Sequence, residues 1–314
     1  MPTRRTLLAA PLLLPSARAF AQPWQPDRQV QLVVGFAPGG GSDIIARTIA
    51  QAAQPLYPQP LVVLNRPGAG GALAAEQVSR AAPDGLTLLL AGGSESTSLP
   101  AHRTMPYDPR TAFAPIIRLT LHGQFITVAA NSPYTTLAQL MAAAKVKPDA
   151  VTHASSGVGS LAHSAFVLLS RAAGVQMLHV PFTGGGPSLQ ALLAGQVDCA
   201  ILAPEEFAGQ LQGGLVRLLG VASAQRVPAY PNVPTLREAG FDVIVENMKG
   251  FVAPAGTPAA ILQSHHDRLR QAMAAPPWQA FMARTGEADG YANGPDFQAA
   301  MTNLLDSISK ALSA

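Results

Sequence analysis

The sequence contains little cysteine and little charge. Cys199 is the only cysteine among 314 residues, so the chain cannot form an internal disulfide. Charged residues make up 12% of the sequence and aromatic residues 6%, whereas 48% is hydrophobic. This composition argues against extensive disorder, and the length is typical of two domains rather than one. Cys199 lies in the apolar run 197–202, which predicts a packed strand residue rather than a reactive thiol.

The sequence also lacks a surplus of positive charge outside its first residues. Its formal net charge is +3, but Arg4, Arg5 and Arg18 all precede residue 22 and no acidic residue does. The remaining chain therefore carries 18 basic and 18 acidic residues. A neutral chain without a dense basic run has no electrostatic means of attracting nucleic acid or an anionic membrane. We expect neither partner.

The first 21 residues have the three parts of a secretory signal. Arg4 and Arg5 precede an apolar run at 7–14, which is too short to span a bilayer. Residues 19–21 then form an A-x-A cleavage site. The paired arginines suit twin-arginine export, and a Sec signal fits equally well. We expect cleavage near Ala21 and a mature chain in the periplasm.

Short apolar strands alternate with helical stretches along the mature sequence, a pattern typical of mostly parallel sheets with crossover helices. Thr136 and Gly174 fit as caps of helices at 137–145 and 161–173. Near Phe251 the chain is expected to turn helical. The order of elements predicts an α/β chain of two lobes with a cleft between them, in which the C-terminal helices return to the first lobe. The expected divisions are a signal peptide at 1–21, a first lobe at 22–123 plus 247–314, and a second lobe at 124–246.

Four turns share one design, in which an apolar strand leads through a loop rich in Gly or Ser into a helix. They span 35–43, 65–76, 155–163 and 181–188. Glycine allows the backbone to approach a ligand closely. The following helix directs free N–H groups and the positive end of its dipole toward the same point. Such turns favour a small anion, a carboxylate or phosphate, bound beyond the strand ends.

Other kinds of site find less support. No loop has the glycine spacing of a dinucleotide site or a P-loop. Ser156 or Ser160 with His163 could serve a hydrolase, but the nucleophile elbow and an acid partner are missing. The seven histidines show no metal-ligand spacing, so we expect no metal and no cofactor. Asp43 is placed to cap the helix start and hold the first loop through backbone hydrogen bonds or, as a weaker alternative, to recognise a ligand ammonium.

The ordered motifs resemble the Bug family, the periplasmic receptors of tripartite tricarboxylate transporters. The segments that carry the likeness include FAPGGGSDIIAR, VVLNRPGAGGALAAEQVSRAAPDGLTLLLA, HASSGVGSLAH, HVPFTGGGPSLQALLAGQVD and GFVAPAGTP. The resemblance implies a type II-like periplasmic-binding-protein fold that closes on a carboxylated solute. The sequence departs from the family pattern at Thr97, at Thr183-Gly184 and at CAILAPEE (199–206). These differences bear on the identity of the ligand more than on the fold.

The resemblance and the loops together nominate a set of ligand-binding residues from both lobes. We expect the chain to be a monomeric receptor, not an enzyme, that delivers a small carboxylate to transporter subunits of the tripartite tricarboxylate type. The solute would be a di- or tricarboxylate, an aromatic acid or an amino acid. The alternatives are a periplasmic serine hydrolase and a ligand-sensing subunit of a signalling system. The nominated residues are Phe36, Ala37, Gly39, Gly40, Ser42, Asp43, Gly70, Ser155, Ser156, Gly159, Ser160, His163, Thr183 and Gly184.

Overall fold

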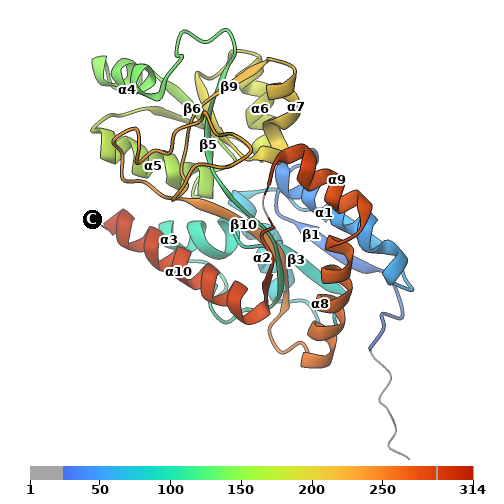
Figure 1. Cartoon of the computed structure of the whole chain (residues 1–314). Coiled ribbons are helices and arrows are strands. Elements are labelled where there is room, and N and C mark those ends of the chain that lie inside the picture. Colours follow the sequence, from blue (N-terminus) through green and yellow to red (C-terminus); the bar gives the residue numbers. More distant parts are fainter. Residues whose placement is uncertain (1–23, 288, 314) are drawn as a thin grey trace, which may run out of the picture.

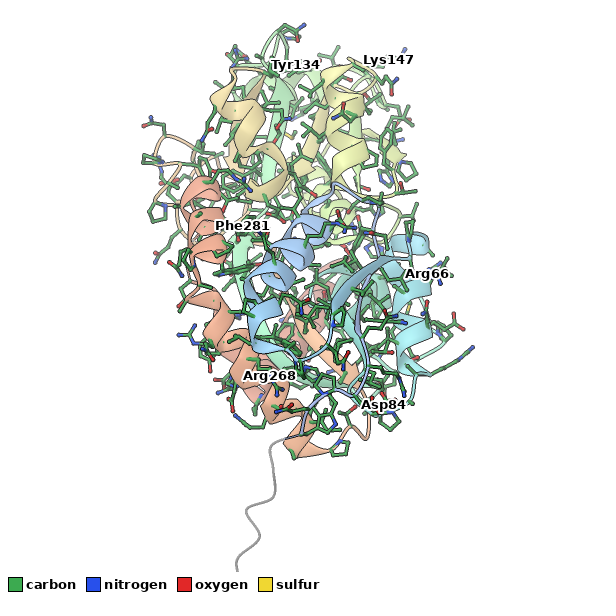
Figure 2. All side chains as sticks on the ribbon, turned by 90° about the vertical axis from the view of Figure 1, so that its right-hand side faces the viewer. Arg66, Asp84, Tyr134, Lys147, Arg268 and Phe281 are labelled. Carbon is green, nitrogen blue, oxygen red and sulfur yellow. The ribbon has the colours of Figure 1, made fainter. Side chains whose placement is uncertain are left out.

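The computed structural model describes residues 24–287 and 289–313. The predicted signal peptide lies outside these residues. The chain forms two β-sheets, each flanked by helices (Figure 1). One sheet lies in the upper half of the molecule and the other in the lower half in this view. Tyr134 and Lys147 mark the far end of one half, and Asp84 and Arg268 mark the opposite end (Figure 2). Among the described helices, none is both long enough and apolar enough to cross a bilayer.

The first sheet has six strands, and we call this sheet with its helices the first lobe. Strands β1, β2 and β3 pair in parallel, whereas β10 runs antiparallel to both β3 and β4. The strand order is β11 (Ala292–Asn293), β4 (Phe113–Gly123), β10 (Glu246–Pro254), β3 (Thr87–Ala91), β1 (Val30–Val34) and β2 (Leu61–Asn65).

The second sheet has five strands and, with its helices, forms the second lobe. Strand β6 is parallel to β7 and β8, and β5 is antiparallel to β8 and β9. The strand order is β7 (Leu178–Pro181), β6 (Thr152–Ser155), β8 (Cys199–Leu202), β5 (Phe125–Ala129) and β9 (Val216–Val221). The chain passes between the lobes at Gln124, after β4, and at Val245, before β10.

The helices begin and end where local chemistry allows. Thr136 Oγ1 accepts the N–H of Gln139 at 3.3 Å, and Gly174 ends its helix with a φ of +63°. Both predicted caps are confirmed. The helices are α1 (Gly41–Ala53), α2 (Ala72–Ser79), α3 (Leu99–His102), α4 (Leu137–Val146), α5 (Leu161–Ala173), α6 (Gly185–Leu193), α7 (Pro204–Gln212), α8 (Ala259–Met273), α9 (Pro276–Thr285) and α10 (Gly294–Ser313). Short helical turns occupy Gln54–Leu56 (η1), Ala69–Gly71 (η2) and Ser94–Ser98 (η3).

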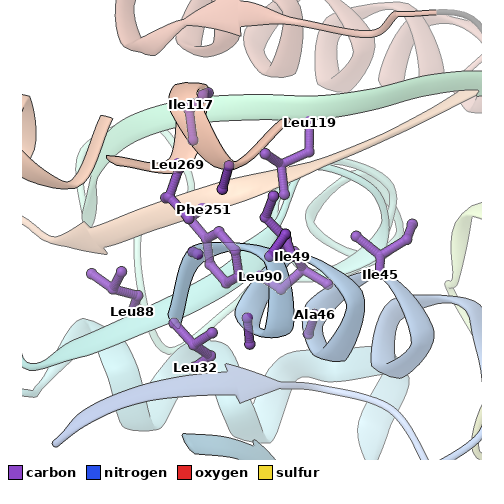
Figure 3. Packing of buried hydrophobic residues seen from close by; sticks show 14 of the residues in the cluster. Leu32, Ile45, Ala46, Ile49, Leu88, Leu90, Ile117, Leu119, Phe251 and Leu269 are labelled. Atoms are coloured by element: carbon purple, nitrogen blue, oxygen red, sulfur yellow. The ribbon is translucent and has the colours of Figure 1, made fainter. Parts of the chain in front are cut away.

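The core of the first lobe lies between α1 and the sheet. Ile45 and Ile49 of α1 face Leu88 and Leu90 of β3 and Phe251 of β10, and all five are buried (Figure 3). Burying one such side chain contributes about 1.5–3 kcal/mol. This packing fixes the start of α1, and with it the first Gly-rich loop, relative to the strands.

Two expectations from the sequence were wrong. Phe251 lies in strand β10 rather than at a helical turn, because β10 fills the gap between β3 and β4. The α/β class with two lobes is confirmed, but both sheets are mixed rather than mostly parallel, because the chain re-enters the first sheet from the second lobe in the opposite direction.

Helix α10 crosses from the first lobe toward the second (Figure 1). Ile308 is buried in the apolar core of the second lobe. Arg171 Nη1 on α5 donates hydrogen bonds to the carbonyl oxygens of Ala311 and Leu312, each at 3.0 Å. Helices α8, α9 and α10 contact elements of the first lobe, and the end of α10 also reaches the second lobe.

Candidate ligand cleft

A narrow cavity lies between the lobes and draws its walls from both. Its volume is about 40 Å³, and a single water molecule needs roughly 10–15 Å³. A solute larger than a few water molecules therefore requires the lobes to part. The cavity is lined by Phe36, Gly41, Ser42, Ser94, Asn247 and Lys249 of the first lobe, by Gln124 at the crossing, and by Ser156, Leu161, Ala162, Gly185, Ile201, Ala203 and Glu206 of the second.

The four Gly- or Ser-rich loops meet in pairs across the interface. In the first pair, Ala37 N–H donates to Thr183 O at 3.0 Å, and a Cβ placed on Gly186 would lie only 3.1 Å from Gly39 O. In the second pair, a Cβ on Gly70 would lie 3.1 Å from Val158 O. The loops of each pair thus contact each other through main-chain atoms.

The N–H groups of the first loop already have acceptors in the protein. Gly39 N–H donates to Asp43 Oδ2 at 2.9 Å, and Gly40 N–H donates to Ala37 O at 3.3 Å. Gly41 N–H donates to Glu206 Oε1 at 3.0 Å. Of the nominated residues here, Phe36 and Ser42 line the cavity, while Ala37, Gly39 and Gly40 form the contact between the lobes.

Asp43 holds the first loop in place rather than facing the cavity. Its carboxylate accepts hydrogen bonds from Gly39 N–H, Arg47 Nε and Asn65 Nδ2. Burial opposes ionisation of this group, but the hydrogen bonds outweigh that effect and lower the pKa of Asp43. The side chain therefore links the start of α1 to strand β2.

Of the nominated residues in the third loop, only Ser156 lines the cavity. Ser155 Oγ lies 2.7 Å from His179 Nε2, and Ser160 Oγ caps α5 by accepting the N–H of His163 at 3.2 Å. Gly159 N–H donates to His163 Nδ1 at 3.1 Å. These groups hold the loop together and lie off the cavity.

A row of histidines lies behind this loop. The rings of His153 and His179 stack at a centroid distance of 4.9 Å, and those of His163 and His179 at 4.2 Å. Burial, together with the charge of the neighbouring histidines, lowers the pKa of His153 to about 3 and that of His163 to about 4. The stack is therefore neutral at physiological pH.

The arrangement does not support a serine hydrolase. Ser156 has no histidine hydrogen bond, and Ser160 only caps a helix. Among the described residues, no carboxylate hydrogen-bonds to His163 or His179 to orient either ring as a base.

Sequence reasoning missed both charged side chains that line the cavity, Lys249 and Glu206. Lys249 lies on β10, and no carboxylate of the described residues forms an ion pair with it. Glu206 is fixed by Gly41 N–H and by Ala203 N–H, at 3.0 and 2.9 Å. Burial raises the pKa of Glu206, and adjacent Glu205 raises it further. A lone lysine in the apolar run ENMKGFVAP was the available signal for Lys249.

Comparison with known proteins agrees with this architecture. The family model described as tripartite tricarboxylate transporter family receptor matches residues 45–310 of the sequence. A UPF0065 protein of Pseudomonas sp. strain P51, from the tcbD-tcbE intergenic region, is 35% identical over 87% of this chain and 82% of its own length. Protein BugT of Bordetella pertussis is 30% identical over 79% of this chain and 77% of its own.

Solved structures show the same fold. The periplasmic binding protein BugD superposes with a TM-score of 0.86 at 31% identity, covering 92% of this chain and 97% of BugD. MatC of Rhodopseudomonas palustris with bound malate gives 0.87 at 30% identity, covering 91% and 99%. These neighbours are solute-binding proteins rather than enzymes. The chain, a solute-binding protein of two α/β lobes, belongs to the receptor family of the tripartite tricarboxylate transporters.

Proposed function

We propose that this protein captures a small carboxylate between its lobes in the periplasm and delivers it to a membrane transporter of the tripartite tricarboxylate type. The observation that carries the proposal is the Lys249 ammonium in the cavity wall, which has no ion-pair partner among the described residues. An ammonium facing a narrow polar cavity is a natural partner for a carboxylate. The malate bound to MatC and the adipate bound to a second R. palustris neighbour support this class of ligand.

The rest of the cavity suggests how the solute lies. Hydroxyl groups of Ser42, Ser94 and Ser156 and the amide of Gln124 come from both lobes and the crossing. They can donate to the same carboxylate that pairs with Lys249, so a bound acid joins the two lobes. The ligand thereby stabilises closure because it contacts both sides at once.

Glu206 restricts what the other end of the solute carries. Its carboxylate accepts the hydrogen bond from Gly41 N–H at the start of α1, and a ligand carboxylate would otherwise bind to this N–H. A second carboxylate at this end is disfavoured by repulsion, and a hydroxyl or ammonium is accommodated. Glu206 therefore favours a solute that carries one carboxylate toward Lys249 and a hydroxyl or ammonium at its other end, as an amino acid does.

The remaining features of this role are also proposals. The signal at residues 1–21 would direct export, with cleavage near Ala21. Residues 124–246 would move as one body against 22–123 and 247–314. The protein would act as a monomer, because one chain supplies both walls of the cavity. Light scattering on a sizing column tests that state.

Binding assays on two lysine variants test the proposal. Tag-free protein is titrated by calorimetry with malate, citrate, adipate, benzoate, glutamate and aspartate. Wild type is expected to bind at least one acid, and Lys249→Met to bind it at least tenfold more weakly. Lys145→Met, which removes an exposed lysine on α4, should bind like wild type. Equal affinity of Lys249→Met and wild type would reject Lys249 as the anchor, and no binding of any acid would reject the ligand class.

Delivery is tested in cells. Deletion of the gene should abolish uptake of the radiolabelled acid identified by calorimetry, and wild type but not Lys249→Met should restore it. Unchanged uptake after deletion would exclude a transport role and leave ligand sensing as the remaining function.

A further inference from the structure

Three metal-ligand side chains converge beside the cleft, from segments far apart in the sequence. His122 lies near the end of β4, Glu205 in the first turn of α7, and Glu287 follows α9. One potential ligand atom from each residue lies within 4.8 Å of the others, and His122 Nε2 is 3.6 Å from Glu205 Oε2. Two ligands of one ion at bond lengths of about 2.0–2.2 Å are separated by roughly 3.3–3.6 Å in tetrahedral geometry and by roughly 3.5–3.8 Å in trigonal geometry. The observed spacing is close to what a metal requires.

These ligand atoms are buried and lack hydrogen-bond partners. The side chains of His122 and Glu205 are 3% and 0% exposed. Within the described part of the chain, His122 Nε2 has no hydrogen-bond partner, and the carboxyl groups of Glu205 and Glu287 contact only each other and the Thr285 side chain. A buried charge without a partner is costly, and such charges are normally paired or bound to metal. The cluster is therefore incomplete as protein alone.

The orientation of the histidine points to the missing group. His122 Nδ1 lies 3.2 Å from Gly123 O, so the N–H at this position donates to the carbonyl. The Nε2 lone pair then faces the carboxyl group of Glu205 at 3.6 Å, which is repulsive unless a cation or a carboxyl proton lies between them. Metal-bound histidines commonly donate their other ring N–H to a backbone carbonyl in this way.

We propose that His122, Glu205 and Glu287 bind a divalent transition-metal ion, with Zn²⁺ or Mn²⁺ as the fitting class. Two carboxylates and a neutral imidazole balance the charge of the ion. The imidazole favours these metals over Mg²⁺ and Ca²⁺, which prefer oxygen ligands throughout. A water molecule would complete the coordination.

The neighbouring surface provides a route of entry. A second cavity of about 230 Å³ is lined by His122, Pro204, Glu246, Gly286 and Glu287 among others. It is distinct from the ligand cavity, which none of the three metal ligands lines. The ion would join the first lobe, through His122 and Glu287, to the second, through Glu205.

The Lys249 ammonium is the main alternative to a metal ion as the group that neutralises Glu205 and Glu287. Its positive charge acts on Glu205 and Glu287 and opposes the rise of their pKa values. It forms no ion pair with either carboxylate, however, and Glu206 adds a further acidic group next to Glu205. Lys249 therefore makes neither an ion pair nor a hydrogen bond with the ligand atoms of Glu205 and Glu287.

Metal titration of tag-free protein, stripped with chelator and free of carboxylate buffers, tests the site. Calorimetry and elemental analysis with ZnCl₂ and MnCl₂ should show one ion per chain and a rise in melting temperature. Glu205→Gln and Glu287→Gln should each weaken binding at least about 100-fold, because each removes a direct ligand. Glu95→Gln, which changes a buried glutamate outside the cluster, should bind metal like wild type.

The outcomes separate metal binding from a proton shared by the two acids. Glu205→Gln should fold stably without metal, since it relieves an unpaired buried charge, and should lose the metal-dependent rise in melting temperature. Absence of binding to wild type would overturn the proposal, as would binding that both glutamine variants retain. Because no carboxylate solute is present, failure here leaves the ligand assays unaffected.

Discussion

Acidification should destabilise the protein through His265, a fully buried histidine on α8. Its Nδ1 lies 2.8 Å from the Tyr57 hydroxyl and its Nε2 lies 2.9 Å from Gly85 O. A neutral ring satisfies both contacts, because Nε2–H donates to the carbonyl and Nδ1 accepts from the hydroxyl. Burial, opposed by the Gly85 carbonyl and aided by the charge of Arg268, lowers the pKa of His265 to about 4.

The size of the effect follows from the two pKa values. The unfolded chain binds a proton at this histidine near pH 6.5, whereas the folded chain does so only near pH 4. The unfolded state therefore takes up more protons as the pH falls below 6.5, so the free energy of unfolding decreases over this window. At pH 5 the loss is about 2 kcal/mol, from 1.36 kcal/mol per pH unit over about 1.5 units.

Urea unfolding at pH 7.5 and pH 5.0 measures this effect. In His265→Gln, the decrease in unfolding free energy between the two pH values should be smaller than in wild type by about 2 kcal/mol. Leu269→Ala, which removes a buried side chain from the same helix, should lose about 2–5 kcal/mol at both pH values. It should keep the wild-type pH dependence. If His265→Gln also keeps that dependence, the assignment of a neutral buried His265 is refuted.

Three further predictions concern single side chains. Thr136→Ala should lower the free energy of unfolding by about 0.5–2 kcal/mol through loss of the α4 cap, measured by urea denaturation at neutral pH, and no change would contradict the capping role. Ser164 Oγ on α5 lies 2.7 Å from Ser98 Oγ across the lobe interface, so Ser164→Ala should increase the radius of gyration in X-ray scattering without ligand, whereas an unchanged radius would show that this contact does not hold the lobes. Burial raises the pKa of the Cys199 thiol, so a thiol reagent at pH 8 should label it only after unfolding, and rapid labelling of the folded protein would contradict its burial.

The sequence predicted the helices and the four loops well because their signals are local. Thr136 and Gly174 mark helix ends through their own side chain or backbone conformation, so nearby residues suffice to find them. Strand β10 was missed because its antiparallel place between β3 and β4 depends on residues more than 100 positions away. Its Lys249 was missed with it.

The cluster of His122, Glu205 and Glu287 shows the same limit more sharply. Metal motifs are recognised in sequence by short, regular spacing, and these three residues are separated by about 80 positions each. Only the closed packing of the two lobes brings them together. Asp43, in contrast, was correctly expected to hold the first loop, because its role depends on groups within a few residues and on the adjacent strand.

The backbone contacts between the Gly-rich loops assign two tasks, closure of the lobes and recognition of the solute, to different atoms. At these loops the lobes meet through main-chain atoms, as in the bond from Ala37 to Thr183, whereas in the proposed function side chains such as Lys249 and Glu206 recognise the solute. Mutations that exchange those side chains can alter the preferred nutrient without rebuilding the closing mechanism. A bacterium that duplicates such a gene can therefore diversify its uptake through a handful of cavity substitutions.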